Sequence, residues 1–263
     1  MKAEKVVDFI VTWLSDYAKN AGVKGFVVGI SGGIDSAVTS TLCAKTNYPI
    51  LCLEMPIHQG ENQVNRAKEH IQNLKITFPN VTSNEIDLTN TFETFKKSVP
   101  QIEENDVVFL ARANTRARLR MTTLYYFAGL NNYLVAGTGN KVEDFGVGFF
   151  TKYGDGGVDI SPIADLLKSE VYKIAEVLNV PQSIIEAKPT DGLFGDSRSD
   201  EDQIGASYDE LEWAMLEAEK GKKSTDFNGR QKVVFEIYNQ RNKANLHKIK
   251  PIPVCEIPKN LKN

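Results

Sequence analysis

A strand, a glycine-rich turn and a helix follow one another near the N-terminus, and this order limits the folds open to the chain. The apolar run at residues 26–30 has the length of a buried strand, and the turn S-G-G-I-D-S at 31–36 leads into a helical stretch that reaches residue 45. Further strands are expected at 50–53, 85–88 and 133–136, with helical stretches at 61–74 and 106–130 between them. This alternation predicts a doubly wound, mostly parallel α/β sheet of about five strands with helices on both faces.

Parallel sheets of this kind bind ligands beyond the carboxyl ends of their strands, so chemistry is expected in the turns after residues 30, 53 and 136. The length of 263 residues suits one such domain over 1–263, with a more helical C-terminal third. The net charge of -3 argues against a protein made mainly to coat nucleic acid.

The chain shows no sign of export or of membrane insertion. No apolar run approaches the roughly 20 residues of a membrane-spanning helix. Asp8 and Asp16 interrupt the apolar pattern of the first 20 residues, which therefore predicts an amphipathic helix rather than a signal peptide. The cysteines at 43, 52 and 255 form no C-x-x-C pair and have no metal-ligand spacing. A reducing cytoplasm is the expected location.

Two glycine-containing polar segments, 137–160 and 188–206, lack helical periodicity. Both are interpreted as long loops. Loops of this length inside a compact domain are often functional lids, and here we expect them to close over bound substrates. The alternative is that they are plain surface connections.

The turn at 31–36 has the composition of an anion site. Glycines let the backbone approach a ligand closely, and the N–H groups of the turn and of the next helix favour phosphate. Neither G-x-x-x-x-G-K-[ST] nor G-x-G-x-x-G occurs in the chain. Asp35 would repel phosphate unless Mg²⁺ lay between them, which suggests a metal ligand. The alternative is a tight strand-to-helix turn in which Asp35 or Ser36 caps the helix.

S-G-G-x-D-S after an apolar strand resembles the pyrophosphate loop of the N-type ATP pyrophosphatases, which split ATP between its α and β phosphates. Later motifs narrow the choice: G-T-G-N-K-V-E at 137–143, G-F-F-T-K-Y-G-D-G-G at 148–157, D-I-S-P-I at 159–163, Leu167-Lys168 and Lys188-Pro189-Thr190. In order and spacing they resemble the NAD synthetase family, up to the pair His247-Lys248. Many bacterial members have G-T-D-H-A-A-E where this chain has G-T-G-N-K-V-E, so contacts from 139 to 142 are left open.

The resemblance implies an adenine nucleotide alpha hydrolase-like, Rossmann-like fold. It also implies a ligase that uses ATP to amidate deamido-NAD with ammonia through an adenylate, giving NAD, AMP and pyrophosphate in the last step of NAD biosynthesis. Mg²⁺ would be held by Asp35 and Glu143, and ATP is the co-substrate. Residues implied to contact ATP are Gly29, Ile30, Ser31, Gly32, Gly33, Ile34, Asp35, Ser36, Thr138, Lys168 and Thr190. Residues implied to contact deamido-NAD are Arg118, Lys152, Asp159, His247 and Lys248. Asp35 and Lys168 are the catalytic candidates, with Lys168 steadying the α-phosphate.

The positions of the arginines on the helix at 106–130 indicate which of them has a role in binding. Arg112, Arg116 and Arg120 recur every four residues and form one stripe, which we interpret as a solvated or ion-paired face. Arg118 lies about 200° round the helix from Arg116. Its position off the stripe favours a different role.

Two other functions remain open at this point. Another N-type ATP pyrophosphatase, such as a tRNA thiolase or an amidotransferase synthetase, is one, although a thiolase would want paired cysteines and a basic face. A non-catalytic regulator that binds ATP without releasing pyrophosphate is the other. Glutamine-using relatives carry an amidase domain ahead of the loop, whereas here the loop begins at residue 29, so ammonia is expected unless a separate subunit supplies it.

The helix at 3–20 and the segment 107–130 carry more apolar surface than one sheet face covers. Such surface often marks an interface, and two-fold dimers are the commonest assembly. The resemblance also implies a homodimer with deamido-NAD at the interface. The alternative is that the aromatic residues of 107–130 pack on the sheet of their own chain.

Overall fold

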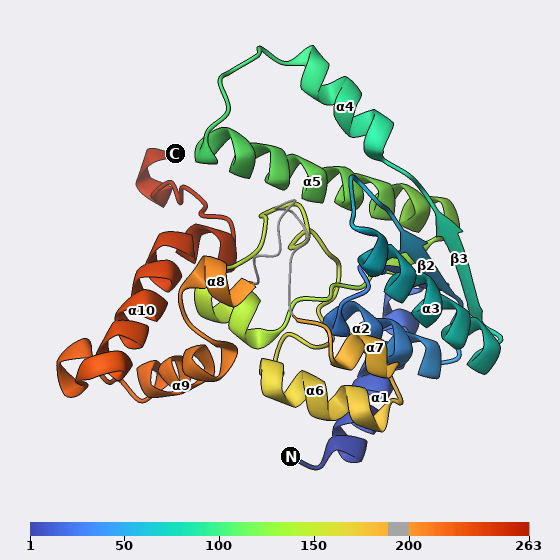
Figure 1. Ribbon diagram of the computed structural model, residues 1–263, viewed down its shortest axis with the longest axis horizontal. Coiled ribbons are helices and arrows are strands. Elements are labelled where there is room, and N and C mark those ends of the chain that lie inside the picture. Colours follow the sequence, from blue (N-terminus) through green and yellow to red (C-terminus); the bar gives the residue numbers. More distant parts are fainter. Residues whose placement is uncertain (189–199, 263) are drawn as a thin grey trace.

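The computed structural model describes residues 1–188 and 200–262. A parallel sheet lies at its centre, with strands β1 (Gly25–Gly29), β2 (Ile50–Glu54), β3 (Val81–Glu85) and β4 (Tyr133–Val135) in the order β3-β2-β1-β4 (Figure 1). The central strands β1 and β2 are buried along almost their whole length, which is why they read as continuous apolar runs. The predicted parallel α/β fold is confirmed.

The expected number of strands is too high, because the described residues contain four. A further pairing is limited to one parallel bridge between Ala136 and Ile160, and Pro162 soon follows without an N–H to extend it. The strand expected at 85–88 lies instead at Val81–Glu85. It is an edge strand with only Val81 buried, so its sequence shows no apolar run.

Helices cover both faces of the sheet (Figure 1). Side chains alternate along a strand, and accordingly Phe26 and Val28 pack on one side of β1 while Val27 packs on the other. The first side holds α1 (Ala3–Ala21), α2 (Ile34–Lys45), α3 (Glu61–Thr77), α6 (Lys168–Val177) and α7 (Gln182–Ile185). The second side holds α4 (Thr89–Ser98) and α5 (Asp106–Asn131). The doubly wound arrangement is therefore confirmed.

The C-terminal third is helical, as predicted. It contains α8 (Asp200–Ile204), α9 (Tyr208–Glu219) and α10 (Gly229–Ile249), with short 3₁₀ turns at Ser224–Asp226 and Lys259–Leu261. Helices α9 and α10 pack around a π-helical segment, η1 (Val142–Val147), and form a second apolar core with it. The segment 137–160 is therefore not an uninterrupted loop. Within the described residues, no helix is long and apolar enough to cross a membrane.

Candidate active site

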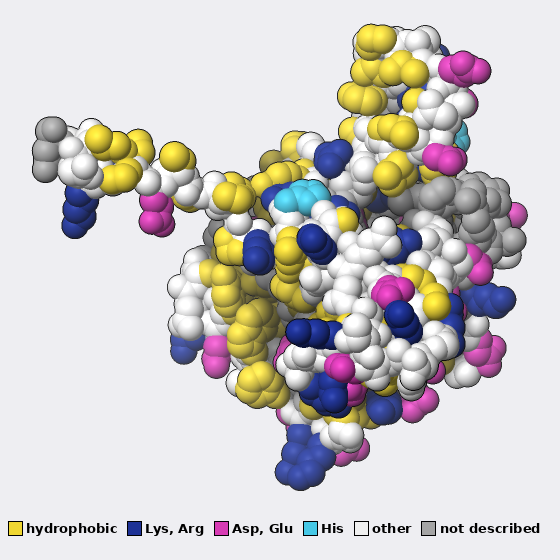
Figure 2. Space-filling model, turned by 90° about the vertical axis from the view of Figure 1, so that its left-hand side faces the viewer, with side chains coloured by type: hydrophobic (Ala, Val, Ile, Leu, Met, Phe, Trp, Pro, Cys, Tyr) yellow, Lys and Arg dark blue, Asp and Glu magenta, His cyan; other side chains and the backbone are white. Residues whose placement is uncertain are grey.

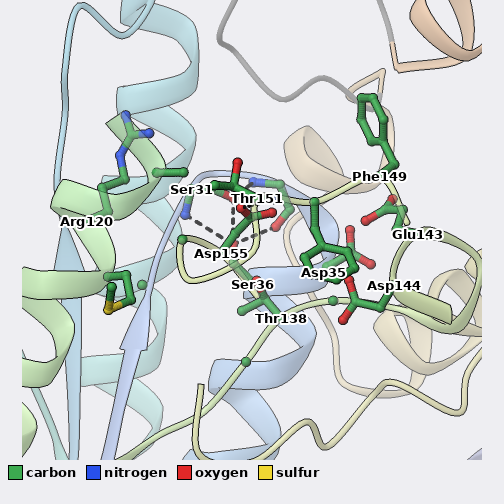
Figure 3. A pocket seen from close by; sticks show the side chains of 18 of the residues that line it. Ser31, Asp35, Ser36, Arg120, Thr138, Glu143, Asp144, Phe149, Thr151 and Asp155 are labelled. Atoms are coloured by element: carbon green, nitrogen blue, oxygen red, sulfur yellow. Dashed lines mark hydrogen bonds between the residues drawn. The ribbon is translucent and has the colours of Figure 1, made fainter. Parts of the chain in front are cut away.

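A cavity of about 770 Å³ opens at the carboxyl edge of the sheet. Every residue from Gly29 to Ser36 lines it, and so do Thr138, Glu143 and Lys168. The segments that follow β1, β2 and β4 contribute to its wall, so the cavity lies where the sequence predicted a site. Figure 3 shows the loop after β1 with carboxylates gathered at one end and Arg120 at the other.

The glycine turn after β1 is closed by its own side chains. The Ser36 hydroxyl donates to the Gly33 carbonyl at 2.9 Å, and the Gly33 N–H donates to Ser31 Oγ at 3.2 Å. Gly32 has a φ of +78°, and a Cβ there would lie 2.4 Å from the carbonyl oxygen of Gln63. Helix α2 starts from Gly33 without a side-chain cap, so neither Asp35 nor Ser36 serves as the N-cap. The capping role that the alternative gave to these two residues is therefore wrong.

A lysine joins two carboxylates in the cavity wall. Lys168 Nζ donates to Asp35 Oδ2 at 2.6 Å and to Glu143 Oε1 at 3.0 Å. Burial alone disfavours the ammonium, but the two carboxylates outweigh it and hold the pKa of Lys168 well above its usual value. Burial also acts against the charge of Glu143, yet Lys168 keeps the pKa of that carboxyl below its ordinary value. At Asp35 burial has the larger effect, and it raises the pKa of that carboxyl above its ordinary value although Lys168 acts against it.

Asn140 fixes the position of both carboxylates, by a side-chain hydrogen bond to Asp35 and by a hydrogen bond to the backbone of Glu143. Its buried amide donates from Nδ2 to Asp35 Oδ1 at 3.2 Å, while Oδ1 accepts the N–H groups of Val142 and Glu143 at 3.1 Å each. The contacts of residues 139–142 were left open by the sequence, and for Asn140 the structure shows contacts within the chain. Sequence reasoning did not identify Asn140, although an asparagine three residues before a glutamate at a helix start is a known capping pattern.

A third carboxylate lies beside this pair. Asp144 lies near Glu143 and Asp35 (Figure 3). Its side chain packs against Gly139, where an added Cβ would lie 2.0 Å from Asp144 Oδ2. Burial raises the pKa of Asp144 well above its usual value, and the nearby charges of Glu143 and Asp155 add to this. A side chain at position 139 would therefore clash with Asp144 as it is placed here. No group of three or more metal-ligating side chains occurs in the described part of the chain.

The residues implied to bind deamido-NAD only partly converge. Arg118, Lys152, His247 and Lys248 all line the cavity. Arg118 donates to the Lys152 carbonyl at 3.3 Å, and Lys152 Nζ donates to the His247 carbonyl. Lys248 Nζ donates to two carbonyls of the 148–150 segment at 2.9 Å.

Asp159 and Thr190 are the two site candidates that the structure does not place in the cavity. Asp159 is absent from the cavity wall, and its carboxylate accepts the Tyr125 hydroxyl at 2.9 Å and the Val135 N–H at 2.8 Å. Thr190 and most of the second predicted loop lie outside the described residues.

Two arginines of the predicted stripe on α5 are less solvated than expected, because Arg116 is buried and Arg120 is half-buried. Arg116 is 8% exposed and stacks on Phe92 of α4, with 5.7 Å between the guanidinium carbon and the ring centroid. Arg120 donates to the Met55 carbonyl at 2.9 Å and to Gln59 Oε1 at 2.7 Å, and burial lowers its pKa to about 10. Helix α4 covers Arg116, and the segment after β2 covers part of Arg120.

The other two arginines of α5 are consistent with the expectations from helix phase. Arg112 forms an ion pair with Glu104, as expected of an ion-paired face. Arg118, off the stripe, is exposed at the mouth of the cavity.

A parallel sheet with a glycine turn at β1 and carboxylates around a lysine defines the class of nucleotide-binding α/β proteins. The NAD synthase family model matches residues 6–252. The NH(3)-dependent NAD(+) synthetase of Mesoplasma florum is 41% identical over 214 residues, which is 81% of this chain and 84% of that protein. The protein of the same name from Syntrophomonas wolfei is 36% identical over 265 residues, covering 100% of both chains. The structure of NMN synthetase from Francisella tularensis has a TM-score of 0.84 at 32% identity, covering 98% of this chain and 100% of that one. The chain belongs to the NAD synthase family.

Proposed function

We propose that the cavity is the active site of this ligase and that its residues act as follows. The chain amidates deamido-NAD with ammonia at the expense of ATP, giving NAD, AMP and pyrophosphate. One observation carries the assignment of the site: the glycine turn and the cluster of Lys168, Asp35 and Glu143 line a single cavity. We further propose that 1–263 is one domain and that the enzyme works in the cytoplasm.

The reaction runs in two steps. The nicotinate carboxylate attacks the α-phosphorus of ATP, and pyrophosphate leaves with the electrons of the broken P–O bond. Ammonia then attacks the acyl carbon of the adenylate, loses a proton, and AMP leaves. Residues 29–36 hold the ATP phosphates. Thr138 also contacts ATP, and so does Thr190, which lies outside the described residues. The ammonium of Lys168 stabilises the charge that develops on the α-phosphate oxygens.

The carboxylates suit Mg²⁺. Asp35 and Glu143 converge on one cation in the structure, the Lys168 ammonium, at 2.6 and 3.0 Å. Mg²⁺ in proteins is commonly bound by one or two carboxylates with substrate phosphates and waters completing its shell, so two protein ligands are enough. When bound, the ion offsets phosphate charge. Asn140 keeps the two carboxylates facing each other.

A positive end of the cavity suits deamido-NAD, which carries a pyrophosphate and a carboxylate. Arg118, Lys152, His247 and Lys248 supply this end, and Asp159 is proposed as a further contact at its edge. A cavity of about 770 Å³ is in the range that holds one drug-sized ligand, whereas the reaction brings together two nucleotides. We therefore propose a homodimer in which a second copy completes the dinucleotide site.

The test of this function is a pyrophosphate-release assay with purified protein, ATP, Mg²⁺ and deamido-NAD. Ammonium chloride should give equal amounts of pyrophosphate and NAD, and glutamine should give no NAD. Robust use of glutamine would contradict the nitrogen source. ATP binding without pyrophosphate release would instead support a regulator.

The likeness to an NMN synthetase favours one second candidate, amidation of nicotinate mononucleotide. The reacting carboxylate is the same in both substrates, so only the distal half distinguishes them. The ratio of kcat/KM for the two substrates decides. A higher value for deamido-NAD supports the first candidate, and a higher value for the mononucleotide supports the second.

The metal assignment makes its own prediction. Asp35→Asn and Glu143→Gln should each lower Mg²⁺-dependent pyrophosphate release by about 100-fold or more, because each removes a charge that acts on the transferring phosphate. Circular dichroism should show an unchanged fold. Asp165→Asn is the control, since that carboxylate is 99% exposed and pairs with Lys141. Near wild-type turnover of either site variant at limiting Mg²⁺ would remove that residue from the metal site.

A further inference from the structure

Tyr208 touches two members of the cluster at once. It is the first residue of α9 and is 6% exposed. Its hydroxyl donates to Glu143 Oε1 at 2.6 Å, and Lys168 Nζ lies 4.8 Å from the centroid of its ring. The polar end and the aromatic face of one side chain therefore contact different groups of the candidate site.

Tyr208 is itself held in place. Its N–H donates to Glu201 Oε1 at 2.8 Å, and Ser207 caps α9 by accepting the Glu210 N–H at 3.2 Å. One turn further along α9, Glu212 accepts both the N–H and the hydroxyl of Ser169 at 2.7 Å. Residues four apart share one face of a helix, so α9 fixes two successive residues at the start of α6, Lys168 and Ser169.

We propose that Tyr208 is a positioning residue for the ligase reaction. Its hydroxyl orients the carboxylate of Glu143, and its ring supports the ammonium of Lys168. The inference rests on the proposed function of the cavity. A hydrogen bond to a charged carboxylate is among the stronger kinds in proteins, and a desolvated ammonium over an aromatic ring is favourable. The two contacts act on different groups and are separable by substitution.

The test compares Tyr208→Phe, which removes the hydroxyl, with Tyr208→Leu, which removes the hydroxyl and the ring. Tyr238→Phe is the matched control, because Tyr238 is also 6% exposed and belongs to the same apolar core. Three quantities are measured: Mg²⁺-dependent ATP binding by calorimetry without deamido-NAD, kcat at saturating Mg²⁺, and the unfolding temperature.

Tyr208→Phe should weaken Mg²⁺-dependent ATP binding by about tenfold, because Glu143 loses its charge-assisted hydrogen bond. Saturating Mg²⁺ should restore its kcat to within about threefold of wild type, since the ring still supports Lys168. Tyr208→Leu should lower kcat by a further factor of about ten that Mg²⁺ does not restore. Tyr238→Phe should stay within about twofold of wild type in both quantities, because most substitutions away from a functional contact are mild.

Two results would overturn the inference. Unchanged ATP binding in Tyr208→Phe, with a lower unfolding temperature but normal kcat in Tyr208→Leu, would make Tyr208 a packing residue. If Tyr208→Leu does not fold, Tyr208→Phe decides alone, because it keeps the packing volume. Failure of the wild-type protein to bind ATP in a Mg²⁺-dependent way would overturn the proposed function itself, and that failure is visible before any variant is made.

Discussion

At the scale of single residues, Asn140 uses both halves of one amide. Its nitrogen donates to Asp35 while its oxygen accepts two backbone N–H groups at the start of η1, which carries Glu143. A carboxylate at this position would keep the oxygen but lose the donor, and it would repel Asp35. The residue therefore combines a structural cap with alignment of the charges in the cavity, and substitutions can separate the two roles.

Asn140→Asp should be the more stable of the two variants at this position, and Asn140→Ala should be the more active. Asn140→Ala loses the cap and should be less stable by about 1 kcal/mol, whereas Asn140→Asp keeps an acceptor there. Asn140→Asp should nevertheless lose at least as much activity, on the order of tenfold or more, because it places a like charge against Asp35. Thermal unfolding and pyrophosphate release measure the two effects. The same order in both measurements would show that Asn140 acts only as a cap.

At the scale of elements, the helix that starts at the glycine turn is tied to its neighbour by one buried polar contact. His70 Nε2 of α3 lies 2.9 Å from Ser40 Oγ of α2, and the imidazole is 2% exposed. Burial lowers the pKa of His70 to about 4, because the protonated ring would lose its hydration in the core. Protonation therefore works against the packing of α2 on α3.

The stability of the protein should fall as the pH decreases through this range. His70 has a folded pKa of about 4 against an ordinary value of 6.5, so the unfolded chain binds more protons between these values. The contribution of the neutral His70 to the free energy of unfolding is complete above pH 6.5 and is lost as the pH falls toward 4. Over this range it amounts to about 3 kcal/mol. His70→Gln keeps a hydrogen-bonding group and should flatten this part of the profile of unfolding free energy. His58→Gln is the control, because His58 is exposed. An equal flattening of the stability profile in His58→Gln would contradict the assignment to His70.

An element could be predicted from sequence where residues next to one another in the chain determine it. Strand β1, its turn and α2 follow one another in the chain, and their pattern was sufficient. Strand β3 was misplaced because an edge strand has few buried residues to mark it. The buried face of α5 could not be recognised, since Phe92, which covers Arg116, comes from another element. Tyr208 was missed for the same reason: 65 residues separate it from Glu143, and only the packing of α9 on η1 brings them together.

At the scale of the whole molecule, an arm lies at the top of Figure 1, and Figure 2 shows apolar side chains on it. The arm comprises α4, residues 99–105 and the start of α5. Its exposed apolar residues are Phe95, Val99, Ile102, Val107 and Leu110. Residues of α5 such as Leu124 and Phe127 do pack on the sheet of their own chain, but Tyr126 and Leu130 remain exposed. The alternative that the apolar residues of α5 pack on their own sheet therefore holds for Leu124 and Phe127, whereas Tyr126 and Leu130 are free to contact a second copy.

The last prediction is that the wild-type protein is a homodimer with α5 at the centre of its interface. A specific interface buries about 1,200 Å² or more, and a charge placed inside it is costly. Val107→Asp is the best probe, because Val107 is 77% exposed and an aspartate in the first turn of a helix favours folding. Tyr125 is less suitable, since its hydroxyl already bonds to Asp159 within the chain.

Val107→Asp should sediment as a monomer and lose deamido-NAD turnover while keeping Mg²⁺-dependent ATP binding, because the glycine turn and the Lys168 cluster belong to one chain. Ile76→Asp on α3 makes the same kind of change outside both apolar helices, at a side chain that is 74% exposed, and should remain a dimer with normal activity. Loss of the dimer in both variants would point to general destabilisation rather than to an interface on α5. A wild-type protein that is an active monomer at assay concentration would rule out the shared dinucleotide site, since no second copy would then be present to complete it.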